Sequence, residues 1–420
     1  MNENNQVSHN GLVVKLPNHR SLFMASFACF LCAEPIQYIL NIFGVNGTAQ
    51  LALTLAIVYL PLVAGLLCRR TIKWGFLALI VLVAAIVAFT LLIYPEYKDV
   101  LVGDKYYYSF KNQVLAPFGS IFGFLFVEYI DDFKDIKKVF IISAIILFAF
   151  YSVQAAQSGG VWVVGNTGRI AYYSMSFSYG ILFPILIFFT YGFENKRIIP
   201  IIVGIAGVFE IIVYGSRGAL VVLMLYFILY MLWAWVPKRR QIKWVFVSLA
   251  SIMLVFFFVS ANLQEELINT LINRTSSLGY NSRLLSVLSS RSLFSEDRIT
   301  SIWPATLQLI KNSFLLGNGL YSNHFYNGGF AHNIILELIA DFGLLFGGGM
   351  LLFCGKTIND VIKKSNYKEE RFIFVIIISF CIGRLMFSSS FWYEKLFWIY
   401  LACYFKINKY NPRLEMQNDI

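Results

Sequence analysis

The chain has 420 residues, of which 58% are hydrophobic and only 14% are charged, and its net charge is +11. A soluble domain of this length could not cover so much apolar surface, so the composition excludes that class of protein. The basic excess alone would also suit a nucleic-acid-binding protein. Its distribution along the chain decides between nucleic-acid binding and a signal for membrane topology.

Apolar stretches long enough to cross the hydrocarbon core of a bilayer recur along the whole chain. Each must be helical, because lipid offers no partner to free backbone N–H and C=O groups. The sequence therefore predicts an all-α, polytopic membrane helix bundle, with residues 1–420 forming a single integral membrane domain. We expect about twelve spans, at 21–40, 48–68, 74–94, 113–130, 139–156, 171–191, 198–214, 218–236, 244–261, 332–353, 372–389 and 391–405.

The distribution of Lys and Arg sets the expected orientation. With both termini in the cytoplasm, the inner segments hold 22 of these residues and the outer segments hold 11. This bias follows the positive-inside rule, so the basic excess is explained as a topology signal and nucleic-acid binding is not expected. The first twenty residues are polar and carry no cleavable signal pattern, so we expect the first span to remain as an anchor.

One predicted outer loop, residues 262–331, is much longer than the others and lies between the ninth and tenth spans. Long loops are usually either functional or disordered, and this one contains apolar residues at helical spacing, so we expect it to be folded. Residues 295–312 predict a short helix, with Ser295 as its cap, two acidic residues in its first turn and Pro304 as a possible kink.

Six ionisable residues are predicted inside the membrane, and all fall in its outer half or near its middle: Glu34, Glu210, Arg217, Glu337, Asp341 and Arg384. Such residues are costly in a bilayer, and they commonly mark a functional chamber. A polar chamber open to the outside would gather them on one side. The alternative is a set of buried ion pairs that only fix helix packing.

The segment AHNIILELIADFG (331–343) opens the tenth predicted span. In a helix that starts at His332, Asn333 and Glu337 share a face, and Asp341 continues the same polar seam inward. His332 would then lie at the outer mouth of the seam, either as a catalytic group or as an ordinary histidine at a span end. The glycine-rich turns GNG (317–319) and NGG (327–329) precede it, and we expect them to be flexible.

Arginine is the main cation of the outer segments, whereas the inner segments favour lysine. A planar guanidinium can bind phosphate through two parallel hydrogen bonds, so four arginines become candidate phosphate ligands. They are Arg217 in the glycine-flanked segment YGSRGAL, and Arg283, Arg291 and Arg298 in the long loop. The alternative for the loop arginines is contact with solvent or lipid headgroups. We find no pair of outer carboxylates suited to a metal, and no nucleotide-binding loop.

Three motifs in this order resemble the O-antigen polymerase and O-antigen ligase superfamily. They are SRGAL (216–220), DRITSIWPATLQLIKNSFLLGNGL (297–320) and HNIILELIADFG (332–343). The similarity is clear in the second half of the chain, whereas the first half shares only the pattern of spans.

The resemblance implies a membrane glycosyltransferase of the GT-C class in the bacterial inner membrane, with a periplasmic active site. Its substrates would be undecaprenyl-pyrophosphate-linked oligosaccharides, and it would invert the anomeric centre without a metal or other cofactor. By position, Arg217 and Arg298 would bind the donor pyrophosphate and His332 would act on the acceptor, while Arg283 and Arg291 remain candidates. The implied partners are the lipid bilayer, a chain-length regulator and a flippase.

The resemblance leaves three functions open. A polymerase would join lipid-linked repeat units of O-antigen or a related surface polysaccharide, and the stretch from Arg298 to Gly343 is more similar to polymerases. A ligase would instead transfer the glycan to the lipid A-core. A lipid-linked oligosaccharide flippase is the third reading, but alternating access needs polar groups reachable from both sides of the membrane.

The predicted topology can be tested by labelling single cysteines in a cysteine-free background. Cysteines replacing Tyr280, Thr300 and Phe325 should react with a membrane-impermeant thiol reagent added outside the inner membrane. Cysteines replacing Arg240 and Ser365 should be protected until the membrane is permeabilised. Labelling of the second group in intact membranes would reverse the orientation.

Overall fold

A computed structural model of the chain describes residues 18–409, except 70–71, 104–108, 159–161, 165–168, 172–173, 234–268, 271, 275, 278–297 and 366. The helices of its first half are α1 (His19–Leu31), α2 (Ala33–Ile42), α3 (Gly47–Arg69), α4 (Gly75–Ile93), α5 (Lys98–Val102), α6 (Phe122–Tyr129) and α7 (Phe133–Ser158), with short turns η1 (Pro95–Tyr97) and η2 (Lys111–Leu115). Two three-residue strands, β1 (Trp162–Val164) and β2 (Arg169–Ala171), pair antiparallel.

The second half contributes α8 (Met175–Asn195), α9 (Ile198–Tyr214), α10 (Arg217–Trp233), η4 (Arg298–Ile302), α14 (Trp303–Asn312), α15 (Ser322–Asn327), α16 (Ile334–Phe342), η5 (Gly343–Gly347), α17 (Gly348–Lys364), α18 (Lys368–Phe387) and α19 (Lys395–Lys409). The described part of the chain is therefore almost entirely helical, as predicted. The predicted span 244–261 and the loop segment before Arg298 lie largely outside the described residues.

Within the described ranges, five helices are long and apolar enough to cross a membrane: α3, α4, α7, α8 and the run from Ile334 to Lys364. A sixth is formed by α1 and α2 if this bent pair is one span, and α9 and part of α10 are shorter apolar helices. These elements make the chain a multi-pass membrane protein. Twelve spans remain a prediction.

Three predicted spans have a different form in the structure. The first is bent by 72° between α1 and α2. The fourth contains the end of η2 and the eight-residue helix α6, with turns at residues 116–121 between them. The boundary between the last two is a loop at residues 388–394, and α19 begins only at Lys395.

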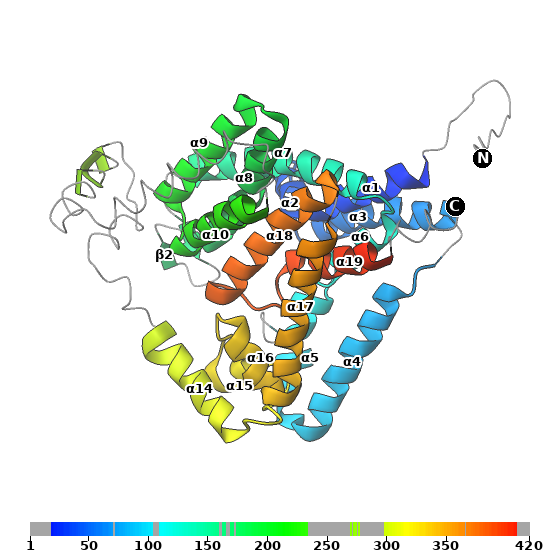
Figure 1. Cartoon of the computed structure of the whole chain (residues 1–420), viewed down its shortest axis with the longest axis vertical. Helices are drawn as coiled ribbons and strands as arrows, with labels where there is room; N and C mark the ends of the chain where they lie inside the picture. The colour runs from blue at the N-terminus through cyan, green and yellow to red at the C-terminus, as the bar shows by residue number, and fades with distance from the viewer. Residues whose placement is uncertain are drawn as a thin grey trace.

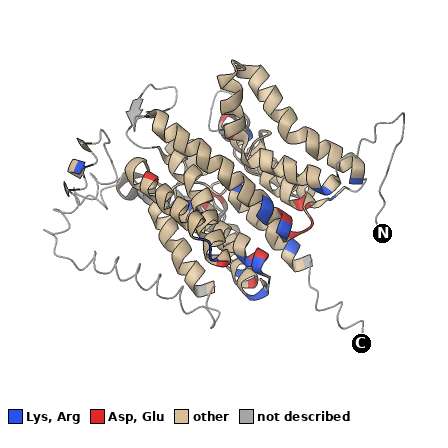
Figure 2. Cartoon of the chain, turned by 90° about the horizontal axis from the view of Figure 1, so that it is seen from above, with Lys and Arg blue, Asp and Glu red and all other residues tan. Residues whose placement is uncertain are grey.

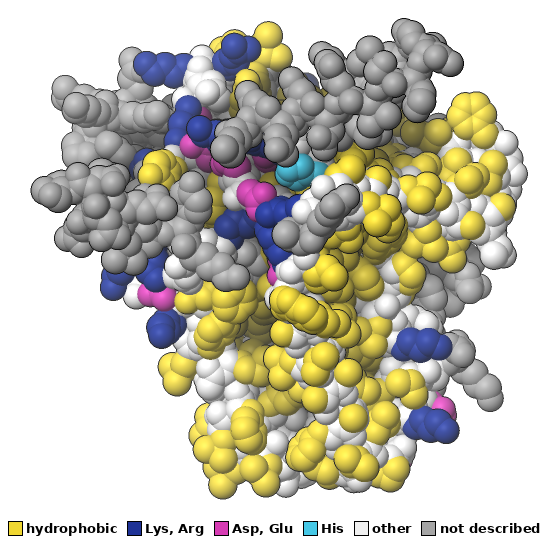
Figure 3. Space-filling model, turned by 90° about the vertical axis from the view of Figure 1, so that its right-hand side faces the viewer, with side chains coloured by type: hydrophobic (Ala, Val, Ile, Leu, Met, Phe, Trp, Pro, Cys, Tyr) yellow, Lys and Arg dark blue, Asp and Glu magenta, His cyan; other side chains and the backbone are white. Residues whose placement is uncertain are grey.

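Ion pairs connect neighbouring helices at the end of the bundle that is predicted to face the cytoplasm, here called the inner end. Arg20 at the start of α1 pairs with the buried Asp135 at the start of α7. At the end of α8, Glu194 lies 3.0 Å from Lys137 and 3.9 Å from Lys368. Charged residues gather at helix ends on the lower right of Figure 2 and over the upper part of the face in Figure 3, above a mainly hydrophobic surface.

Helix α18 runs through the middle of the molecule, between α10 and α17 (Figure 1). It packs against α7, α8, α10, α16 and α19, and thirteen of its residues are buried. At Gly383, a Cβ would lie 2.4 Å from a methyl carbon of Val222, so the α10–α18 contact depends on a residue without a side chain. The outer end of this helix, opposite Lys368, is therefore fixed relative to most of the bundle.

The turn GNG (317–319) is held firmly against α16 and is not free, which corrects the expectation of flexibility. Asn318 donates from its backbone N–H to Ala340 O at 2.9 Å and from its side chain to Leu309 O and Ala340 O at 3.0 Å. Gly317 has φ +79°, and a Cβ there would lie 2.4 Å from Asp341 O. Glycine is required here both by the left-handed backbone and by the close approach.

The substitution Gly317→Ala should therefore destabilise the protein by about 1–3 kcal/mol, the usual cost of a strained backbone. Thermal unfolding of the purified protein in detergent would measure the effect. Gly349→Ala is the matched control, because no atom lies within 4 Å of a Cβ at that position in α17. Equal melting temperatures for the two variants would contradict the proposed role of Gly317.

Candidate functional site

The start of α16 differs from the predicted seam in one respect. The helix begins at Ile334 rather than His332, because Asn333 is its N-cap: Asn333 Oδ1 accepts hydrogen bonds from Ile335 N at 3.0 Å and Leu336 N at 3.2 Å. The Asn333 side chain is therefore used by the helix terminus and does not continue a polar stripe to Glu337. His332 precedes the cap with φ +54°, in the left-handed region.

The two carboxylates of α16 are buried and have separate partners. Glu337 is 3% exposed and accepts a hydrogen bond from Ser390 Oγ. Asp341 accepts from the backbone N–H groups of Tyr321 and Ser322, each at 3.1 Å, and from Ser322 Oγ at 2.7 Å. Asp341 therefore fixes the start of α15 onto α16, which is a structural role.

A second imidazole, which the motifs did not single out, lies beside this segment. The His324 ring in α15 stacks on Tyr321 with centroids 4.4 Å apart, and His324 Nε2 lies 2.9 Å from the Tyr393 hydroxyl. Phe330 lies between the two histidines, 5.7 Å from the His324 ring and 4.2 Å from the His332 ring. The Tyr321 hydroxyl donates to that of Tyr393.

The loop at residues 388–394, with the sequence SSSFWYE, connects these groups to the rest of the bundle. Its Ser390 binds Glu337 of α16, and its Tyr393 binds His324 of α15. Its Ser388 hydrogen-bonds the Tyr179 hydroxyl of α8. The loop therefore joins the start of α16 to the helices on the other side of α18.

The start of α10 lies against the same loop. A Cβ at Gly218 would lie 2.1 Å from the Tyr179 hydroxyl and 2.8 Å from Ser388 Oγ. The preceding turn is held on α8 by Ser216 N–H, which donates to Ser178 Oγ at 2.8 Å. The backbone of Arg217, the first residue of α10, is thus placed at the same end of the bundle as the start of α16.

Three other ionisable residues of the predicted spans have polar partners, two of them neutral hydroxyl groups and one a carboxylate. Tyr151 donates to Glu34 at 2.7 Å, and the neighbouring Ser152 donates to Glu210 at 2.9 Å. Arg384 lies 3.0 Å from Glu394. These contacts support the alternative reading of helix packing for Glu34 and Glu210.

Of the four candidate phosphate ligands, Arg283 and Arg291 lie outside the described residues. Arg298 is the first residue of η4, which leads into α14, and α14 packs on α16. Pro304 is the second residue of α14, and the π-helical turn η4 (Arg298–Ile302) leads directly into that helix, so the helical run changes from π to α next to the proline. Of Arg217 and Arg298 the structure describes the backbone only.

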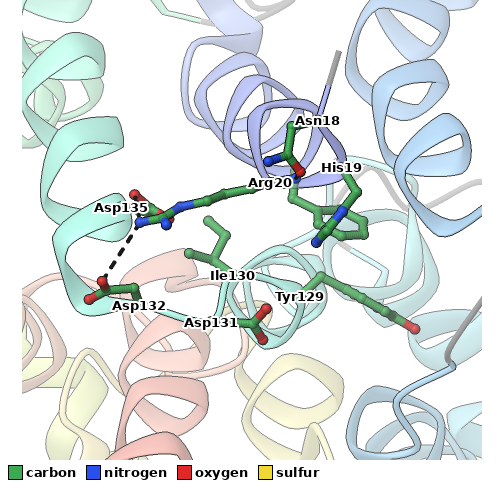
Figure 4. Close-up of a pocket in the computed structure, with 9 residues that line it drawn as sticks. Asn18, His19, Arg20, Tyr129, Ile130, Asp131, Asp132 and Asp135 are labelled. Carbon is green, nitrogen blue, oxygen red and sulfur yellow. Dashed lines mark hydrogen bonds and ion pairs between the residues drawn. The ribbon is translucent and has the colours of Figure 1, made fainter. Parts of the chain in front are cut away.

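A cavity of about 290 Å³ lies at the inner end and is distinct from this site (Figure 4). It is lined by polar residues of α1 and of the α6–α7 connection, among them His19, Arg20 and Asp131. Asp135 at this cavity and Tyr151 beside Glu34 are sixteen residues apart on α7, which corresponds to roughly 24 Å along the helix. In the described ranges, no group of three or more His, Cys, Asp or Glu side chains is arranged to hold a metal ion.

The fold and the placement of the site define a class of protein, namely a multi-pass helical membrane protein with polar groups gathered at one end of the bundle. A family model described as O-antigen ligase matches residues 201–354, a segment that contains Arg217, Arg298 and His332. This match supports the resemblance to the O-antigen ligase and polymerase superfamily, whose members are membrane enzymes of the glycosyltransferase type. No curated protein and no solved structure matches the chain.

Burial, and to a smaller extent the nearby His332, lower the pKa of His324 from 6.5 to about 4. The unfolded chain therefore binds this proton at a higher pH than the folded protein does. By linkage, the free energy of unfolding decreases as the pH falls from about 6.5 to about 4. Above that window this group has no effect on stability.

The melting temperature of the wild type should thus decrease more steeply between pH 7 and pH 4.5 than that of His324→Gln, which keeps an acceptor for Tyr393 but does not titrate. Differential scanning fluorimetry in detergent across this range would measure both slopes. Parallel slopes for the two proteins would show that His324 is not held neutral by the fold.

Proposed function

We propose that the protein is a membrane glycosyltransferase that uses polyprenyl-pyrophosphate-linked glycans as donors on the outer face of the inner membrane. The observation that carries this proposal is the convergence of two segments of the matched region on one loop. The start of α10, with Arg217, contacts Ser388, and α16, which follows His332, contacts Ser390. The residues that bind the donor and the residue that acts on the acceptor must lie close together for the two substrates to react.

The residues suggest a direct displacement. Pyrophosphate is a good leaving group, and arginines near it would stabilise the negative charge that develops as the glycosidic bond breaks. An imidazole, with an ordinary pKa near 6.5, can accept the proton of the attacking acceptor hydroxyl at neutral pH. In this proposal Arg217 and Arg298 bind the pyrophosphate, Arg283 and Arg291 are further candidates, and His332 is the base.

We propose a polymerase of O-antigen or a related surface polysaccharide as the specific activity, on the motif similarity of residues 298–343. A ligase that transfers the glycan to the lipid A-core is the second candidate, which the description of the matching family model favours. Glu337, bound to Ser390, would support the outer site in either case, and Asn333 would position His332 by capping the helix that follows it.

The surface polysaccharide of a strain that lacks the gene distinguishes the two activities. Loss of a polymerase should leave core carrying a single repeat unit. Loss of a ligase should leave bare core together with lipid-linked polymer that accumulates in the membrane. An unchanged banding pattern would contradict both.

If His332 is the general base, His332→Ala should reduce the rate at which purified protein joins lipid-linked repeats by about 10²–10⁴-fold. The native φ of +54° adds a backbone cost to alanine, so His332→Asn is the matched variant, since asparagine tolerates left-handed geometry. Both variants should insert normally and still bind lipid-linked repeat. Near-wild-type turnover by either variant would remove His332 from catalysis.

A further inference from the structure

Arg384 is a cation in the centre of the bundle whose role the proposed mechanism does not use. It lies three residues before the end of α18, on the side of the membrane where α10 and α16 begin. A charged residue inside a membrane helix is costly, and such residues commonly line a ligand path. Its neighbours Gly383 and Leu385 are buried, whereas 29% of the Arg384 side chain is exposed.

Two kinds of contact hold the Arg384 guanidinium. Its central carbon lies 4.8 Å from the ring centroid of Tyr179 and 5.7 Å from that of Phe380, so two aromatic faces support it. Its charge is balanced by Glu394, which is 2% exposed and 3.0 Å away. The other oxygen of Glu394 accepts from Leu396 N at 3.1 Å and thereby caps α19.

The pairing does not use the full hydrogen-bonding capacity of the guanidinium. Within the described part of the chain, Arg384 Nε and Glu394 Oε2 form no hydrogen bond, so the contact between the two side chains is an ion pair without the two-pronged geometry. A guanidinium offers five donors in a planar fork. Arg384 therefore has donors left for a further acceptor.

The position of Arg384 connects it to the start of α10. Tyr179 supports the guanidinium with its ring, and its hydroxyl occupies the space where a Cβ of Gly218 would lie. Ser388, the next partner of Tyr179, donates its N–H to Arg384 O at 2.8 Å. The residue before Gly218 is Arg217, so two arginines come from adjacent helices to one end of the bundle.

We propose that Arg384 is a further anion-binding residue of the outer site and donates hydrogen bonds to the pyrophosphate of the lipid-linked donor. Glu394 is a positioning residue that balances and orients this cation while the site is empty. The inference rests on the proposed function, because it names a ligand for the same site. Phosphate oxygens suit the remaining donors of the fork and also carry the negative charge that a second arginine at this end of the bundle, Arg217, requires, whereas a neutral sugar would supply no such charge.

The test is binding of farnesyl pyrophosphate, a short polyprenyl pyrophosphate, to the full chain purified in detergent. Arg384→Lys keeps the charge and the partner of Glu394 but loses the planar fork. The double variant Arg384→Gln with Glu394→Gln removes both charges together, so no buried charge is left unpaired. Each should bind farnesyl pyrophosphate about tenfold more weakly, the loss expected for one charge-assisted hydrogen bond.

The comparison ligand is farnesyl monophosphate, and the control variant is Lys395→Gln, which removes a neighbouring cation that lies over the Phe30 ring instead. A ligand contact predicts a loss of preference for pyrophosphate over monophosphate at unchanged melting temperature, and wild-type binding by the control. A purely structural ion pair predicts an unchanged preference. Arg384 variants that keep the wild-type preference would overturn this role alone. Wild-type protein with no preference for farnesyl pyrophosphate over farnesol would overturn the proposed donor as well.

Discussion

The outer part of this structure depends on the carboxylate of Asp341. It is 2% exposed and accepts three hydrogen bonds from Tyr321 and Ser322, at the point where the chain turns back toward the membrane. A buried carboxylate without partners would be strongly destabilising, so the position of α15 on α16 is determined by this need. The imidazole of His324 and the segment that carries His332 acquire their places from the same contact.

The loop at residues 388–394 also supplies partners to buried polar groups, and it does so for several helices at once. Its serines and Tyr393 satisfy polar groups on α8, α15 and α16, and its Glu394 balances Arg384. Polar contacts between helices are specific in direction, whereas apolar packing alone tolerates sliding. The residues of a site built on such contacts are held in place by rigid elements, even though these residues are far apart in the sequence.

Much of this arrangement could be read from the sequence, because apolar length and helical periodicity are local properties. The helices α3, α4, α8 and α9 begin and end within four residues of the predicted spans for that reason. The seam from Asn333 was wrong because an asparagine before an apolar run is used as an N-cap, which its residue type could have signalled. The roles of His324 and Ser390 could not be found, since their partners lie 69 and 53 residues away in sequence. The phosphate-binding roles of Arg217, Arg283, Arg291 and Arg298 stay predictions.

The break between α1 and α2 has an electrostatic consequence for any anionic substrate. A helix that restarts inside the bundle presents a new positive terminus there, and α2 does so at Ala33. Glu34 occupies the first turn of α2 and accepts a hydrogen bond from Tyr151, so the chain supplies its own negative charge to this terminus. The positive end of α2 is thereby already balanced by a carboxylate of the chain itself, so this terminus does not offer a free positive charge to an anionic ligand.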